Sequence, residues 1–288
     1  MTTSAGLARA LALVMASRPD EALRELATLP ASEAVQPQAW YLRTAALSQL
    51  ERWAEAADAA RQGLAAGGPD PDLLCLLAGA ERELGRLETA ERALLDGLAI
   101  DPQHVDLLCG YARLCLQVRQ LDKAAKLVER AAALDPHAAP VYAIRVQLAY
   151  AQGDDRTAQQ IAREFVAEYP EDARAHAMLG STSALRGQVH AADSGFRQAA
   201  SAEPTVNEYA EAALETRILE HPLLIPVRPF MRFGTIKTWV AAVVVLYGLR
   251  MLGLRALSFV FALVWLALCV YSWVVPPLVR RWMTRRWR

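Results

Sequence analysis

The five histidines of this 288-residue sequence are its first candidates for metal binding and for acid–base chemistry. A helical metal site needs two ligands three or four residues apart, as in an HExxH motif. No histidine pair has that spacing and no HExxH occurs, so we expect no metal site and no metal cofactor. The histidines are His104, His137, His176, His190 and His221.

The four cysteines and the glycines give no sign of catalysis. The cysteines form no CxxC pair, and Cys75 and Cys109 stand 34 residues apart in the same position of a repeat. The sequence also has no glycine-rich phosphate loop and no nucleophile elbow. We therefore expect a protein that is not an enzyme, with no cofactor and no small-molecule substrate.

Two residue types return every 34 positions and point to the elements that would hold any site. Proline ends helices, and the register of six alanines would arise by chance with a probability of about 10⁻⁴. Only a methyl group there lets two helix backbones approach closely. The prolines are Pro102, Pro136, Pro170 and Pro204; the alanines are Ala22, Ala56, Ala90, Ala124, Ala158 and Ala192.

This pattern resembles the tetratricopeptide repeat (TPR) family, whose unit is a pair of antiparallel helices. The resemblance covers about residues 5–220: a degenerate first hairpin, five full repeats and a closing helix. It implies an all-α fold, a right-handed superhelical solenoid of TPR-like hairpins over residues 1–220. The five full repeats are expected to begin near Pro37, Pro71, Val105, Ala139 and Ala173.

In TPR proteins the first helices of the hairpins line a concave groove that binds partner proteins. The resemblance therefore implies partner-binding residues on these helices, with Asp72, Ile144 and Met178 as further candidates. The lysine and asparagine clamp of some members is missing here. Arg82 and Arg113 would suit an acidic or mixed amphipathic segment, although ordinary solvated side chains would look the same. The principal groove residues are Tyr41, Leu76, Arg82, Arg113, Gln147, Tyr150 and Arg174.

Charge divides the chain into two parts. The first 222 residues hold all 31 Asp and Glu but only 21 of the 31 Lys and Arg, which gives a net charge of −10. The remaining residues carry ten Lys or Arg and no acid. A repeat domain of this charge would repel phosphate, so we expect no binding of nucleic acid.

The C-terminal part is apolar enough to suggest a membrane hairpin. After a proline-rich connector at 221–235, runs at 236–254 and 256–275 each approach the roughly 20 residues that span a bilayer. We expect a two-helix transmembrane hairpin over 236–279, with one span as the alternative. The basic tail, 280–288, would bind lipid at the membrane interface and place both ends in the cytoplasm. Its interface residues are Arg280, Arg281, Arg285 and Arg286.

Two functions fit these expectations. The first is a membrane-anchored, non-enzymatic scaffold, in a bacterial inner membrane, that binds a segment of a partner protein in the concave groove. The second is a structural subunit or assembly factor of a membrane complex that acts mainly through its transmembrane hairpin. Neither the partner nor the oligomeric state follows from the sequence.

Overall fold

A computed structural model describes the chain except for residues 1–4, 205, 221–222, 224–234, 252–253 and 287–288. The described elements are all helices, and the prediction of an all-α helical-repeat fold is confirmed. Short turns join most of them into antiparallel pairs. The helices are α1 (Ala5–Met15), α2 (Pro19–Ala27), α3 (Ala31–Ala34), α4 (Pro37–Gln49), α5 (Trp53–Gly67), α6 (Pro71–Glu83), α7 (Leu87–Ile100), α8 (Val105–Gln117), α9 (Leu121–Leu134), α10 (Ala139–Ala151), α11 (Asp155–Glu168), α12 (Ala173–Leu185), α13 (Val189–Ala202), α14 (Asn207–Glu220), α16 (Thr235–Met251) and α17 (Arg255–Arg286).

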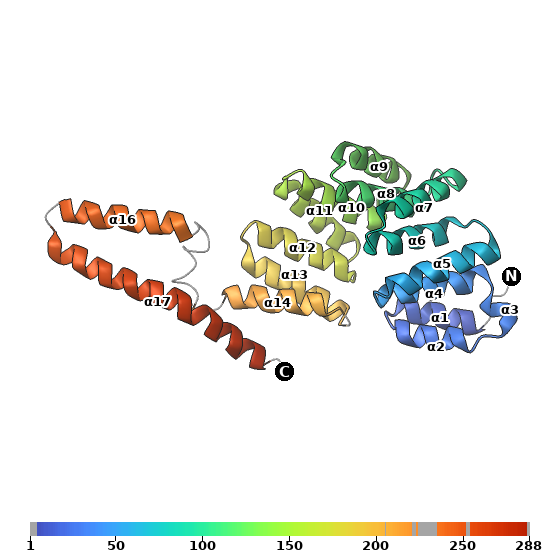
Figure 1. The fold of residues 1–288 in the computed structure, drawn as a ribbon, viewed down its shortest axis with the longest axis horizontal. Helices are drawn as coiled ribbons and strands as arrows, with labels where there is room; N and C mark the ends of the chain where they lie inside the picture. Colours follow the sequence, from blue (N-terminus) through green and yellow to red (C-terminus); the bar gives the residue numbers. More distant parts are fainter. Residues whose placement is uncertain (1–4, 205, 221–222, 224–234, 252–253, 287–288) are drawn as a thin grey trace.

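The hairpins follow one another along a curved path from α1 and α2 through α8 and α9 to α13 and α14 (Figure 1). Each first helix packs on its own second helix, and α4, α6, α8, α10 and α12 also pack on one another in that order. These five first helices begin at positions 34 residues apart. They therefore form one continuous layer, and their shared face is the place to look for a binding surface.

The alanine column explains how each hairpin closes. All six alanines of this column, one in each second helix from α2 to α13, are 0% exposed. A methyl group is the largest side chain that such a close helix contact accepts. The core around them is built from leucines and valines such as Leu94, Leu107 and Val128.

A second column sets the turn inside each hairpin. Six residues at 34-residue spacing have φ between 53° and 79°, in the left-handed region that favours glycine. Glycine occupies only three of these turns, so the other three hold a side chain in a backbone conformation that costs about 1–2 kcal/mol. The six residues are Ser17, Glu51, Gly85, Arg119, Gly153 and Gly187.

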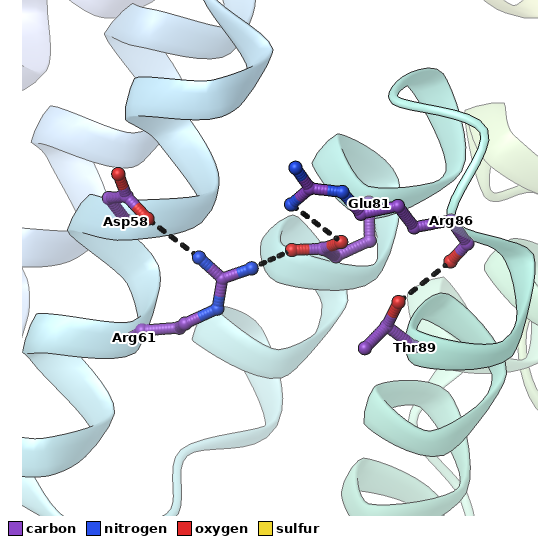
Figure 2. Close-up of polar contacts among 5 residues, drawn as sticks. All are labelled: Asp58, Arg61, Glu81, Arg86 and Thr89. Atoms are coloured by element: carbon purple, nitrogen blue, oxygen red, sulfur yellow. Dashed lines mark hydrogen bonds and ion pairs between the residues drawn. The ribbon is translucent and has the colours of Figure 1, made fainter.

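A buried carboxylate joins the second and third hairpins. Glu81 of α6 is 1% exposed and forms ion pairs with Arg61 of α5 and with Arg86, the latter at 3.6 Å (Figure 2). Arg61 also pairs with Asp58 at 2.6 Å. The corresponding positions of the other full repeats hold Leu47, Cys115, Ala149 and Ser183. An ion pair thus occupies a place where the other repeats carry apolar or small residues.

Helices α16 and α17 lie apart from the hairpins as a separate pair (Figure 1). Within the described part of the chain, no helix is both long enough and apolar enough to cross a membrane. Helix α16 has 17 residues, and α17 continues past the predicted end of its span through Pro276 and Pro277 to Arg286. This finding contradicts the predicted localisation in a bacterial inner membrane, and the two transmembrane spans have no support.

Two other predictions for this region lie outside what the structure describes. Most of the connector 221–235 is not described, and neither are the side chains of the basic tail residues. Their predicted contact with lipid is therefore untested. The undescribed basic side chains are those of Arg280, Arg281, Arg285 and Arg286.

Candidate functional site

Two adjoining cavities lie on the shared face of the first helices. The mixed cavity, of about 310 Å³, contains both acidic and basic side chains, and the basic cavity, of about 570 Å³, contains no acid. Arg82, Arg113 and Arg174 line both and so form the boundary between them. The mixed cavity is lined by Tyr41, Asp72, Cys75, Leu76, Ala78, Gly79, Arg82, Leu94, Asp106, Cys109, Gly110, Arg113, Pro140 and Arg174; the basic cavity by Arg82, Arg113, Leu116, Gln117, Ala143, Gln147, Arg174 and Met178.

Helical periodicity places these side chains. On α6 they recur at intervals of three and four residues from Asp72 to Arg82, and α8 shows the same spacing from Asp106 to Gln117. Residues at this spacing share one face of a helix. Because Tyr41 of α4 and Arg174 of α12 line the same cavity, the curvature of the solenoid brings its first and last full hairpins to one site.

Arg113 lies at the centre of this site and lacks a partner. Its Nε atom is enclosed without a hydrogen bond. Loss of water around the guanidinium lowers its pKa, and the positive charges of Arg82 and Arg174 lower it further. In the described part of the chain no carboxylate oxygen lies within ion-pair distance of Arg113, whereas Arg82 contacts Glu83 and Arg174 lies 3.5 Å from Asp172.

The mixed cavity has a different electrostatic character. His104, the N-cap of α8, lies between its own helix and the neighbouring one: Nδ1 accepts from the Leu107 N–H at 3.4 Å, and Nε2 lies 3.1 Å from Asp72 Oδ1. Burial, followed by the charges of Asp72 and Asp106, raises the pKa of Tyr41. These two acids therefore make this side of the site unfavourable for a further negative charge.

The two cysteines at the site are unsuited to nucleophilic chemistry. Burial, followed by the charge of Asp106, raises the pKa of both Cys75 and Cys109 to about 12. Such thiols stay protonated at neutral pH, and the thiolate is the reactive form. Among the described residues, no group of three or more His, Cys, Asp or Glu side chains could hold a metal ion.

The structure places the predicted groove residues in three environments. Six of them line the cavities, while Tyr150 is 54% exposed on α10 and lines neither. The further candidate Ile144 is 0% exposed, so its prediction as a groove residue is wrong: the groove face of α10 carries Pro140, Ala143 and Gln147. The six lining residues are Tyr41, Leu76, Arg82, Arg113, Gln147 and Arg174. Whether they bind a partner stays a prediction.

Sequence reasoning missed Asp106 and Pro140. Asp106 stands 34 residues after Asp72, which was already a groove candidate, so the repeat register would have identified it. Pro140 is in the first turn of α10, where a proline is typical of helix starts and draws no attention to a cavity.

Solved structures show the same fold. The chain is similar to a thermophilic TPR protein of Thermus thermophilus, with a TM-score of 0.59 and 18% identity over 64% of this chain and 100% of that one. It is also similar to the Cut9–Hcn1 hetero-tetramer of the APC/C, with a TM-score of 0.56, 13% identity and coverage of 73% and 42%. No protein-family model matches the sequence, and neither does any curated protein.

These likenesses establish a helical-repeat fold of the TPR type. At such low identity they carry no information about partners. The chain spans less than half the length of the Cut9–Hcn1 chain that it matches, so nothing about that assembly transfers to it.

Proposed function

We propose that this protein is a non-enzymatic scaffold that binds a segment of a partner protein across the mixed and basic cavities. The observation that carries the proposal is the convergence of Tyr41 and Arg174, from the first and last full hairpins, on one hollow surface. Solenoids of stacked repeats use such extended concave surfaces for binding. The TPR-type fold supports the same class of function.

The composition of the surface also supports a protein partner. Interfaces are held by a few side chains, among which tyrosine and arginine are frequent, surrounded by apolar contacts. Here three arginines and Tyr41 lie beside Leu76 and Leu116. Nothing at the site supports a reaction, because its thiols are protonated and the described residues offer no metal site.

The apolar pair α16 and α17 favours a second candidate function. Its helices expose large apolar side chains, among them Trp239, Phe259 and Leu266 at 54%, 67% and 61%. A patch of this kind is characteristic of a protein-interaction surface. The alternative is therefore a structural subunit that joins a complex through α16 and α17, with the hairpins as a support.

Site-specific photo-crosslinking distinguishes the two. A photoreactive amino acid replaces Gln147, which lines the basic cavity, or Leu266 on α17; a third version replaces Glu88, whose side chain is 93% exposed on α7. We expect a discrete crosslinked protein from the full chain labelled at Gln147 and none from Glu88. Crosslinks from Leu266 alone would overturn the groove proposal in favour of the subunit.

A further inference from the structure

The two cavities differ in the charge that they can accept. The basic cavity is lined by three arginines, two glutamines and no acid, and the mixed cavity adds Asp72 and Asp106. The repeat domain around them is strongly acidic, so this cluster of arginines is a local reversal of charge. A ligand that crosses both cavities therefore meets a positive region and then a region that contains negative charges.

Arg113 defines where the negative group of a ligand would bind. It lies between Arg82 and Arg174, and the described residues give it no ion pair. Its enclosed Nε donor has no acceptor. A buried donor without a partner is costly, and a guanidinium pairs best with a carboxylate through two parallel hydrogen bonds. An acid in the basic cavity would remove both the unpaired donor and the mutual repulsion of the arginines.

The opposite side restricts the rest of the ligand. Asp72 and Asp106 would repel a second acid, because like charges at close distance raise the free energy of binding. The walls around them, including Leu76 and Leu94, favour apolar side chains. Leu116 and Met178 give the basic cavity an apolar border as well. A run of acids and a nucleic acid strand both fit this arrangement poorly.

We infer that the partner segment places a single Asp or Glu side chain on Arg113 in the basic cavity and apolar, neutral or basic residues in the mixed cavity. The inference rests on the proposed function and names the chemistry of its partner. It is a claim about a side chain within the segment. The mixed-charge pattern, read in one direction across the site, gives the segment its orientation.

The test is a selection of short random peptides displayed on phage, performed on the full chain. We expect the selected peptides to share one acidic position with apolar neighbours on one side, where further acids are depleted. A representative synthetic peptide and its Glu→Gln form are then titrated against the wild-type protein. Loss of the carboxylate should weaken binding by about tenfold, the usual value of one charge-assisted hydrogen bond.

Protein variants complete a cycle with the two peptides. Against Arg113→Gln the acidic and amide peptides should differ by less than about twofold, because the partner of the carboxylate is gone. Arg92→Gln, on α7 with a side chain that is 74% exposed, is the matched control and should keep the tenfold difference. If Arg113→Gln fails to fold, the comparison of the two peptides on the wild-type protein still decides.

The outcomes separate this inference from the function beneath it. Peptides that bind without any acidic preference would overturn the inference and leave the scaffold in place. A preference for several consecutive acids, or for a free terminal carboxylate in place of an internal side chain, would also overturn it. Failure to select any peptide, together with no crosslink at Gln147, would remove the proposed function itself.

Discussion

Ser17 Oγ donates a hydrogen bond of 3.1 Å to Oε1 of Glu203, 186 residues further along the chain. Ser17 lies in the turn between α1 and α2, and Glu203 follows α13. The first hairpin therefore meets the last, and the ends of the α13 and α1–α2 hairpins lie near each other in Figure 1. The described hairpins form a nearly closed path around the binding surface.

This junction is a single hydrogen bond between half-buried groups, so its energetic weight is small. Ser17→Ala and Glu203→Ala should each lower the free energy of unfolding by about 1 kcal/mol. The double variant should lose no more than either single variant, because both remove the same bond. Urea unfolding of the four proteins measures the coupling; fully additive losses would show that the two side chains act separately.

The left-handed turn column predicts a stabilising substitution. Arg119 has a φ of 63°, and its side chain is exposed. Arg119→Gly should raise the free energy of unfolding by about 0.5–1 kcal/mol, since relief of backbone strain exceeds the entropy that glycine adds to the unfolded chain. Chemical denaturation measures it. Arg119→Ala is the control and should give no gain, because alanine keeps the strain.

The reverse change tests the same backbone argument. A Cβ atom on Gly85 would meet no atom within 4 Å, so Gly85→Ala creates no steric clash with its neighbours. Its φ of 76° nevertheless makes the substitution costly, by about 1 kcal/mol. An unchanged stability of Gly85→Ala would contradict backbone strain as the cause of both effects.

The alanine column predicts a loss from added volume. Ala56 on α5 is 0% exposed, whereas Ala66 on the same helix is exposed. Ala56→Leu should destabilise the protein by about 1–3 kcal/mol through overpacking of the hairpin. Ala66→Leu should change stability by less than about 0.5 kcal/mol. Thermal unfolding of the pair gives the answer, and equal effects would argue against a special packing role for the column.

The buried ion pair predicts opposite results for its two partners. Arg61→Ala leaves the Glu81 carboxylate buried without its main partner and should cost about 3 kcal/mol. Glu81→Leu copies the residue of the preceding repeat, Leu47, and should be neutral or stabilising, because it removes the desolvated charge. Denaturant titration of both variants tests this, and a large loss from Glu81→Leu would mean that the ion pair itself holds the two hairpins together.

Alkaline pH should weaken the fold through its buried thiols. The pKa of Cys109 is about 12 in the folded protein and about 8.5 in an unfolded chain. Between these values the unfolded state has lost the proton that the folded state keeps, so stability falls as the pH rises, by up to about 1.4 kcal/mol per pH unit. Urea unfolding from pH 8 to pH 11 measures this slope.

A variant isolates the contribution of that thiol. Cys109→Ala should have a smaller slope of stability against pH than the parent protein. The neighbouring truncation Leu108→Ala also removes a buried side chain, 0% exposed, but has no group that titrates, so its slope should match that of the parent. Identical slopes for all three proteins would assign the alkaline instability to other groups.

Sequence periodicity predicted the repeat fold because each hairpin is a local structure. The register of Ala22 to Ala192 reports a contact between two helices that are adjacent in the chain, and such contacts repeat with the sequence. The exposure of Ile144 was not predictable to this resolution, since a shift of one residue on α10 separates the groove face from the core. Glu81 posed a similar difficulty, because a lone glutamate in a helix is ordinarily exposed.

The site was harder to predict than the fold. Its arginines could be named from their helices, but their convergence with Tyr41 depends on curvature summed over several hairpins. Small rotations between repeats accumulate, and no local pattern encodes their total. The C-terminal prediction was wrong in a different way: composition alone was taken as a measure of span length, whereas α16 and α17 do not follow the predicted boundaries.

The contact between Ser17 and Glu203 also bears on the order in which the protein folds. The hairpins pack on neighbours in the sequence, so they can form independently and in any order, at the speed of local helix pairing. The terminal junction cannot form until the hairpins between its two ends have taken up their curvature. Its formation is therefore expected as a late kinetic phase, and refolding of Ser17→Ala should lack that phase while the earlier ones keep their rates.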